Sequence, residues 1–214
     1  PQRLILGPWN HVSMRGKGAS HVGEVEFGES AFWGDVILNR ERFRWFDRWL
    51  KDIDTGVDDD DPVRIFVMGG GTGATAGTGR IFHGGEWRTE REWPLKRAVD
   101  TTYFLRSGGG LALAEPDAED PSTTWLHNPE SPVPSVSGNV TGFYEWVVLP
   151  PDIDAAYVPQ RARMKSLIPD GPLHQLERDS TVGASTPPAL LADRPDVNVF
   201  ETEPLESDIE MTGP

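Results

Sequence analysis

The sequence changes character at an acidic run, residues 58–61, which ends at Pro62. Before the run lies one long amphipathic segment, and after it come only short apolar stretches separated by Gly and Pro. Residues 1–56 carry eight basic and eight acidic side chains, whereas the remaining residues carry 12 basic and 26 acidic ones, and with them the whole formal charge of −14. This change predicts a domain boundary, with an acidic linker at residues 57–62.

The acidic run has two interpretations. Carboxylate oxygens are the ligands that Ca²⁺ prefers, so adjacent Asp residues suggest a calcium site. The run lacks the spaced Gly and the terminal Glu of an EF-hand loop, however. A solvated linker is therefore the favoured interpretation.

Residues 1–56 have the pattern of one βα unit. Residues 3–6 predict a short buried strand, and roughly residues 36–53 have the periodicity of a helix that stops before Gly56. Trp45 lies on or beside the apolar face of this helix, which predicts that it belongs to the core. A strand, a loop and a long amphipathic helix together predict the last βα unit of an α/β sheet. The residues that form the apolar face, including a second predicted core Trp, are Phe43, Phe46, Trp49, Leu50 and Ile53.

The region from residue 63 to residue 214 contains no second long helical stripe. Short strands separated by turn residues predict a β-sandwich or jelly roll. Residues 209–214 alternate apolar and polar side chains and end in a turn dipeptide, so a final strand is expected there. No sequence follows that could supply a neighbouring strand, which suggests that the chain is an internal segment of a longer protein. The other predicted strands cover residues 63–68, 101–105, 124–126, 142–149 and 197–202.

Composition excludes several classes of function. The chain has no Cys, so it has no disulfide, zinc-thiolate cluster or catalytic cysteine. No run reaches the roughly 18 apolar residues of a membrane helix, and the acidic balance argues against a nucleic-acid partner. The three Gly-x-Ser triplets, which end at Ser20, Ser30 and Ser185, lack the following Gly of a nucleophile elbow. A cytoplasmic location is favoured, although absent Cys is compatible with either side of a membrane.

His11 is the main candidate for chemistry. It lies five residues beyond the first predicted strand, and open α/β sheets place catalytic groups in loops at the carboxyl ends of their strands. In hydrolases of this kind the triad runs Ser, acid, His, so the His should follow the final strand and precede the final helix. Neutral imidazole can accept the serine proton and return it to the leaving group. A structural role in the loop is the alternative. Trp9 is a second candidate, either as a wall of an acyl pocket or as packing beneath the loop.

Several stretches together resemble the CocE/NonD hydrolases, the family of cocaine esterase, the Xaa-Pro dipeptidyl-peptidases and the glutaryl-cephalosporin acylases. Matching stretches fall along nearly the whole chain. They are residues 4–11 (LILGPWNH), 23–33 (GEVEFGESAFW), 44–57 (RWFDRWLKDIDTGV), 62–69 (PVRIFVMG), 86–95 (EWRTEREWPL), 128–139 (NPESPVPSVSGN) and 194–214 (RPDVNVFETEPLESDIEMTGP).

The resemblance implies a serine hydrolase that cleaves an ester or amide bond, acyl or Xaa-Pro dipeptidyl, through an acyl-enzyme. Residues 1–56 would be the C-terminal end of its α/β-hydrolase catalytic domain, and residues 63–214 a galactose-binding-like jelly-roll sandwich, incomplete at its C-terminus. His11 would be the triad base, with the Ser and Asp in the upstream part of the same domain. The chain alone would then lack a nucleophile and be inactive. The substrate would be a small ester or amide or a peptide, no metal or organic cofactor is implied, and a homo-oligomer is left open.

The sequence departs from the family pattern at two places. Members of this family often have Gly-Pro-x-Asp-Gln where this chain has His174 in place of the Asp. The Gly-rich segment at residues 69–79 is longer than expected. That segment weakly resembles a dinucleotide fingerprint, but it leads into no helix, so it predicts a hairpin loop.

A rival hypothesis is a carbohydrate-binding module, because jelly rolls commonly bind sugars and exposed Trp faces can stack on them. Trp87 and Trp93 bracket a turn and are the candidates, with packing as the alternative. This hypothesis depends on fold analogy. A third hypothesis assigns residues 62–214 a purely structural or oligomeric role. The spacing of His21, His83 and His127 does not suggest a metal site.

Overall fold

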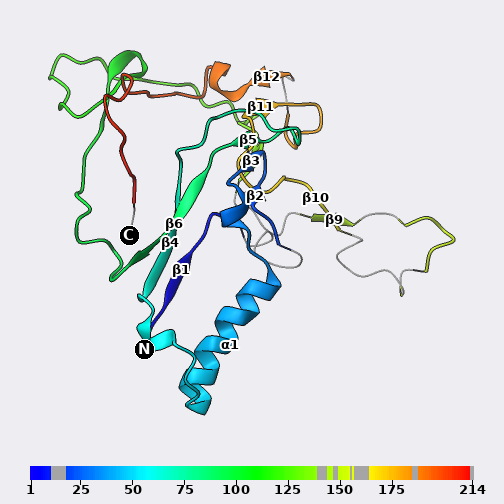
Figure 1. Cartoon of the computed structure of the whole chain (residues 1–214). Helices are drawn as coiled ribbons and strands as arrows, with labels where there is room; N and C mark the ends of the chain where they lie inside the picture. The colour runs from blue at the N-terminus through cyan, green and yellow to red at the C-terminus, as the bar shows by residue number, and fades with distance from the viewer. Residues whose placement is uncertain are drawn as a thin grey trace. The chain divides into compact units, whose positions relative to one another are not determined.

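The structure, a computed structural model, describes residues 1–10, 18–138, 144–146, 149–154, 156, 164–184 and 188–212. It contains one long helix and many short strands (Figure 1). The chain divides into two compact units. Unit 1 comprises residues 1–91 and 135–174, and unit 2 comprises residues 92–134 and 175–214.

The central sheet of unit 1 has the strand order β1-β4-β6. Strand β1 (Leu4–Leu6) runs parallel to β4 (Val63–Met68), and β4 runs antiparallel to β6 (Gly85–Glu90). The predicted strand at 63–68 is thus confirmed. The strand predicted at 3–6 is present from Leu4, but its predicted burial is wrong, because Leu6 is 39% exposed and the other two residues are half-buried. Because β1 and β4 are parallel and the long helix lies between them in sequence, the three elements form a βαβ crossover. The strand that follows the acidic run therefore pairs with the strand that opens the chain, while the predicted boundary at 57–62 stays a prediction.

Helix α1 (Asp35–Lys51) confirms the predicted helix to within two residues at either end. It ends at Asp52, whose φ of 56° is left-handed and whose N–H donates to the carbonyls of Arg48 and Asp47. The helix thus stops before Gly56, because Asp is one of the few residues that tolerate this conformation.

The predicted burial of the helix face is wrong for the part of the chain that the structure describes. No residue of α1 is buried there. Phe43 is 66% exposed, Leu50 is 76% exposed and Trp49 is 41% exposed, while Trp45 is half-buried. Periodicity defined the face correctly, but burial requires a neighbouring element, and none of the described elements covers these side chains.

A second small sheet of unit 1 packs against the first. Strands β2 (His21–Val22), β3 (Val25–Glu26) and β5 (Ile81–Phe82) form it, and the 3₁₀ turn η1 (Glu29–Ala31) follows β3. The buried cluster between the sheets consists of Val22, Phe27, Ala31 and Phe66, with Val25 and Trp87 packed against it.

The Gly-rich segment forms the predicted hairpin loop. It leads from β4 back to β5, and the N–H groups of Gly71 and Gly73 donate to the carbonyls of His83 (2.8 Å) and Phe82 (3.0 Å). A Cβ at Gly71 would lie 2.3 Å from the backbone of His83, so only Gly allows this close approach.

The acidic run is largely exposed, but two of its carboxylates are tied to the rest of unit 1, and its role as a linker stays a prediction. Its first part forms the 3₁₀ turn η2 (Val57–Asp59). The Asp60 carboxylate accepts hydrogen bonds from Arg3, next to β1, and from Arg44 of α1 (2.9 Å). Asp58 accepts one from Arg48 (2.6 Å). These pairs fasten the end of the crossover to its helix and first strand.

The loop that contains His174 packs on the turn between β2 and β3. The His174 N–H donates to a carboxylate oxygen of Glu24 (2.8 Å), and the Glu24 N–H donates to the Pro172 carbonyl (2.9 Å). Elsewhere in unit 1, β9 (Tyr144–Trp146) pairs antiparallel with β10 (Met164–Ser166). Strand β9 lies within the strand predicted at residues 142–149.

Unit 2 has two small hairpins. Strand β7 (Phe104–Leu105) pairs with β8 (Leu111–Ala112) around the 3₁₀ turn η3 (Ser107–Gly109). Strand β11 (Leu176–Glu177) pairs with β12 (Ala189–Leu190), which leads into the 3₁₀ turn η6 (Leu191–Asp193).

Several predicted strands of unit 2 are wrong or shorter than expected, and the described residues form no closed sandwich. Residues 124–126 and 209–212 form no strand, residues 197–202 contribute one bridge at Glu201, and only the end of 101–105 is a strand. Trp125 and Leu126 are 62% and 85% exposed. Alternating side chains specify a strand only where a neighbour and a buried face are present. None of the helices in the described ranges is long and apolar enough to cross a membrane.

Candidate functional site

His11 lies outside the described residues, within the segment 11–17. The described residues on either side of it show where this segment is attached. It follows β1, the strand that pairs in parallel with β4, and begins directly after Asn10, which is 9% exposed. The attachment point is therefore the carboxyl end of a parallel strand, and the buried amide side chain lies in the interior of unit 1.

Both flanks of the His11 segment contact one residue, Trp33. On the C-terminal side, the Ala19 N–H donates to the Trp33 carbonyl (2.9 Å) and the Trp33 N–H donates to the Ala19 carbonyl (3.1 Å). On the N-terminal side, the ring centroids of Trp9 and Trp33 are 4.6 Å apart. Trp33 is 3% exposed, so the two ends of the segment meet on a buried anchor.

Two glycines make these contacts sterically feasible. A Cβ at Gly7 would lie 1.8 Å from the Trp9 ring, so any side chain there would displace that ring. Gly18 has a φ of +91°, and a Cβ on it would lie 2.4 Å from the Trp33 carbonyl oxygen. Both positions require Gly for close packing, and Gly18 also requires it for its backbone conformation.

Trp9 belongs to a cluster with Trp33 and Trp87. The Trp87 ring centroid lies 5.9 Å from those of Trp9 and Trp33. The Trp87 indole N–H donates to the Ser30 carbonyl (2.7 Å), and the Arg64 guanidinium lies 4.4 Å from the centre of its ring. Tilted aromatic pairs of this kind each contribute about 0.5–1.5 kcal/mol beyond their area burial.

This cluster accounts for the packing of two residues that the sequence singled out. Trp9 packs against Trp33 and Trp87, and both of its predicted roles, as a wall of an acyl pocket and as packing beneath the loop, stay predictions. Trp87 has a ring and an N–H that are both engaged within unit 1. Trp33 was missed by the sequence reasoning, although it ends the stretch at 23–33 that carries part of the family resemblance.

The charged groups nearest to β1 form a cluster around Asp60. Burial alone would raise the pKa of Asp60, but the hydrogen bonds from Arg44 and Arg3 outweigh it, so its pKa is lowered. The guanidinium of Arg44 also lies 3.6 Å from Glu41. The hydrogen bond to Asp60 is the largest influence on Arg44, and its pKa is raised. Asp60 and Arg44 thus form an ion pair at neutral pH, which joins the acidic run to α1.

The other histidines form no metal site in the described part of the chain. His21 lies 3.9 Å from the Glu26 carboxylate, and the His83 ring packs against Phe27. No group of three or more His, Asp or Glu side chains among the described residues is arranged to hold a metal ion.

Comparison with known proteins places most of the chain in one family. Residues 55–214 match the family model of the X-Pro dipeptidyl-peptidase C-terminal non-catalytic domain. Cocaine esterase from Rhodococcus sp. (strain MB1 Bresler) is 28% identical over 146 residues, which are 64% of this chain and 22% of that protein. The chain therefore matches about a fifth of the length of this relative. No solved structure matches it. His11 lies on the N-terminal side of the segment that matches the family model.

Proposed function

The chain belongs to the family of X-Pro dipeptidyl-peptidase C-terminal non-catalytic domains, and from this membership we propose that the whole protein is a serine hydrolase of the CocE/NonD type. It cleaves an ester or amide bond of a small molecule or peptide through an acyl-enzyme. His11 is the general base, and the nucleophilic Ser and the Asp of the triad come from another segment of the same catalytic domain. Residues 1–56 belong to the α/β-hydrolase domain, and residues 63–214 form a non-catalytic jelly roll.

One structural observation supports the role of His11 in this proposal: the His11 segment is attached at the carboxyl end of a parallel strand, and both of its flanks contact Trp33. Parallel sheets place reacting groups at this edge, because the loops that follow successive strands converge there. A general base must stay within about 3 Å of the hydroxyl from which it takes a proton. Fixed flanks restrict where a short segment can place its side chains, so this anchoring suits a catalytic His.

The proposed mechanism gives His11 two successive tasks. Its imidazole takes the proton of the Ser hydroxyl as that oxygen attacks the carbonyl carbon, and then donates this proton to the leaving alcohol or amine. In the second half it takes a proton from water as the water oxygen attacks the acyl carbon. It then returns this proton to the Ser oxygen as the bond to the acyl group breaks and the acid is released. The Asp holds the imidazole in the required tautomer.

The exposed face of α1 supports a partner within the same protein. Phe43, Phe46 and Leu50 are 50–76% exposed and lie along one side of the crossover helix. Crossover helices of α/β sheets pack their apolar face on the strands they connect and on the neighbouring ones. In this proposal the remaining strands of the catalytic domain cover the face, and a second copy of the chain is the alternative occupant.

The test is the substitution His11→Ala in the whole protein. Hydrolysis of a p-nitrophenyl ester should fall at least about a thousandfold, because removing a triad member leaves only binding and oxyanion stabilisation. The matched control is His21→Ala, which removes a half-buried imidazole beside Glu26 and should leave turnover unchanged. The proposal fails if the His11 variant, with an unchanged melting temperature, hydrolyses the ester at the wild-type rate.

A further inference from the structure

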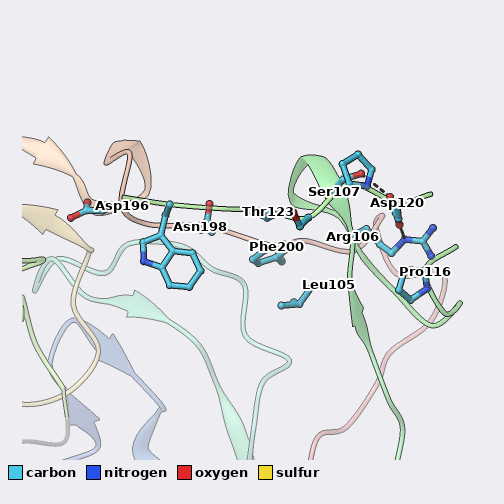
Figure 2. A pocket seen from close by; sticks show the side chains of 12 residues that line it. Leu105, Arg106, Ser107, Pro116, Asp120, Thr123, Asp196, Asn198 and Phe200 are labelled. Atoms are coloured by element: carbon cyan, nitrogen blue, oxygen red, sulfur yellow. Dashed lines mark hydrogen bonds and ion pairs between the residues drawn. The ribbon is translucent and has the colours of Figure 1, made fainter. Parts of the chain in front are cut away.

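A cavity of about 630 Å³ lies within unit 2 and has no role in the proposed hydrolase chemistry. Three parts of the chain line it: the end of β7 with the start of η3, residues 116–125, and residues 196–200. Figure 2 shows the labelled side chains in a row, from Asp196 on one side, past Asn198, Phe200 and Thr123, to Arg106 and Asp120 on the other. Its volume is within the range of sites that bind small molecules.

The charges at one side of the cavity are paired with each other. Arg106 Nε lies 2.7 Å from Asp120 Oδ2, and the Ser107 hydroxyl donates to Asp120 Oδ1 (2.9 Å). Arg106 Nη1 donates to the carbonyls of Ala114 and Glu115, both at 3.0 Å. The guanidinium and the carboxylate therefore neutralise each other on the wall.

The charge at the other side is also matched. Arg194 donates from Nε and Nη2 to the two oxygens of Asp196, both at 2.9 Å. These bonds lower the pKa of Asp196, which therefore remains a paired anion through the neutral range. The bidentate pair orients the carboxylate and leaves its second lone pairs able to accept from a neutral donor.

Between the two ion pairs the wall is apolar and aromatic, with neutral polar groups beside it. Leu105, Phe200 and Trp125 line the cavity, and Trp125 is 62% exposed. Within the described ranges the side chains of Thr123 and Asn198, which also line it, make no hydrogen bond to the protein. An exposed indole next to unengaged hydroxyl and amide groups provides both a flat apolar surface and directional donors and acceptors.

We propose that this cavity binds an uncharged ring that carries hydroxyl groups, such as a sugar unit, with the apolar face of the ring on Trp125 and its hydroxyls on Asn198, Thr123 and Asp196. A charged ligand fits less well, because each charge on the wall already has an opposite partner. A purely apolar ligand fits less well too, because it would bury the polar groups without replacing their bonds to water. This site is independent of the hydrolase proposal and needs no triad residue.

The test is a titration of the 214-residue chain with the methyl glycosides of glucose, galactose, mannose and N-acetylglucosamine, followed by calorimetry and by saturation-transfer NMR. At least one glycoside should bind saturably, with a Kd on the order of 1 mM. Trp125→Ala should weaken that binding about fivefold or more, which corresponds to the stacking contribution of one aromatic ring. Trp49→Ala is the matched control, because it removes a partly exposed Trp of unit 1, and it should leave the affinity unchanged.

Two further measurements keep the proposal falsifiable. Asn198→Ala tests the polar contacts without removing the ring and should also weaken binding. Glucuronate and glucose 6-phosphate test the neutral character of the wall and should bind more weakly than the methyl glucoside. The proposal is overturned if no glycoside saturates below about 50 mM, if neither variant weakens binding, or if a charged sugar binds more tightly than its neutral counterpart.

Discussion

Unit 1 buries nine apolar side chains among the described residues, whereas unit 2 buries one, Leu95. The most buried side chain of unit 2 is charged: Glu177 is 0% exposed and lies 3.5 Å from Arg194, which also binds Asp196. The two units thus combine the same kinds of short strand with different sources of stability.

Unit 1 is stabilised mainly by apolar burial, which is non-directional, whereas the interior of unit 2 depends on ion pairs, which are directional. Apolar burial contributes in proportion to the area removed from water and needs no particular partner. A buried carboxylate is tolerated only while its partner stays in place, because an uncompensated buried charge is costly. Loss of packing should therefore damage unit 1, and loss of one charge should damage unit 2.

The largest effect should come from Phe66→Ala in unit 1. Phe66 is 7% exposed, and its ring centroid lies 5.3 Å from that of Trp87. Truncation of a buried Phe lowers the free energy of unfolding by about 3–5 kcal/mol. Urea denaturation of the 214-residue chain, monitored by Trp fluorescence, measures this loss. The matched control is Phe46→Ala on the exposed face of α1, and equal losses for both variants would contradict an apolar core at Phe66.

A smaller and local effect is expected for Arg194→Met in unit 2. This change leaves Glu177 buried without its guanidinium and removes the bidentate partner of Asp196. Amides of unit 2 should exchange hydrogen faster, while those of unit 1 should keep their protection. Arg178→Met, an exposed residue beside Glu177 in sequence, is the control and should change neither. Equally faster hydrogen exchange in both units would contradict the idea that only unit 2 depends on the ion pairs of Arg194.

Asp60→Asn tests two of the ionic contacts that fasten the acidic run in unit 1, those of Asp60 with Arg3 and Arg44. The loss at pH 7 should be about 1 kcal/mol, because the carboxylate is partly exposed and solvent screens its pairs with Arg3 and Arg44. Since the pKa of Asp60 is lowered in the folded chain, its contribution is fully present above about pH 4, the ordinary range of an Asp.

The pH dependence provides the check on that variant. The stability difference between wild type and Asp60→Asn should shrink as the pH falls below about 4, because the carboxylate becomes protonated in both states. Urea denaturation midpoints of both proteins, taken from about pH 3 to about pH 7, measure this stability difference across the range in which an ordinary Asp titrates. Asp61→Asn, an exposed neighbour, should give no such trend. A difference that stays constant with pH would mean that Asp60 acts by packing alone.

The smallest effect on the 214-residue chain should come from Leu50→Ala. Leu50 is 76% exposed, so the free energy of unfolding should change by no more than about 0.5 kcal/mol. In the whole protein the same change should cost about 2 kcal/mol or more, because the proposed catalytic domain buries this face. Thermal denaturation of both proteins measures the contrast, and equal small effects would count against that cover.

Sequence reasoning predicted the elements that local patterns specify. Helix α1, strand β4 and the hairpin loop at residues 69–79 follow from apolar periodicity and from glycine, which act over a few residues. It also predicted the family, which the match of residues 55–214 confirms. It did not predict Trp33 as the anchor of the His11 segment, because that role depends on contacts with Trp9 and Ala19 that periodicity cannot show.

The amino-acid sequence by itself determined, to within two residues, where α1 and β4 begin and end, because hydrogen bonds and side-chain spacing within a short stretch decide these limits. It did not predict β6, although that strand is as long as β4. Only the tertiary structure decided that β1 pairs with β4 across the acidic run, that the face of α1 stays exposed in the described chain, and that residues 124–126 form no strand. The physical reason is that pairing and burial need a partner distant in sequence. The local pattern shows which side chains form an apolar face, and the fold determines whether another element packs against that face.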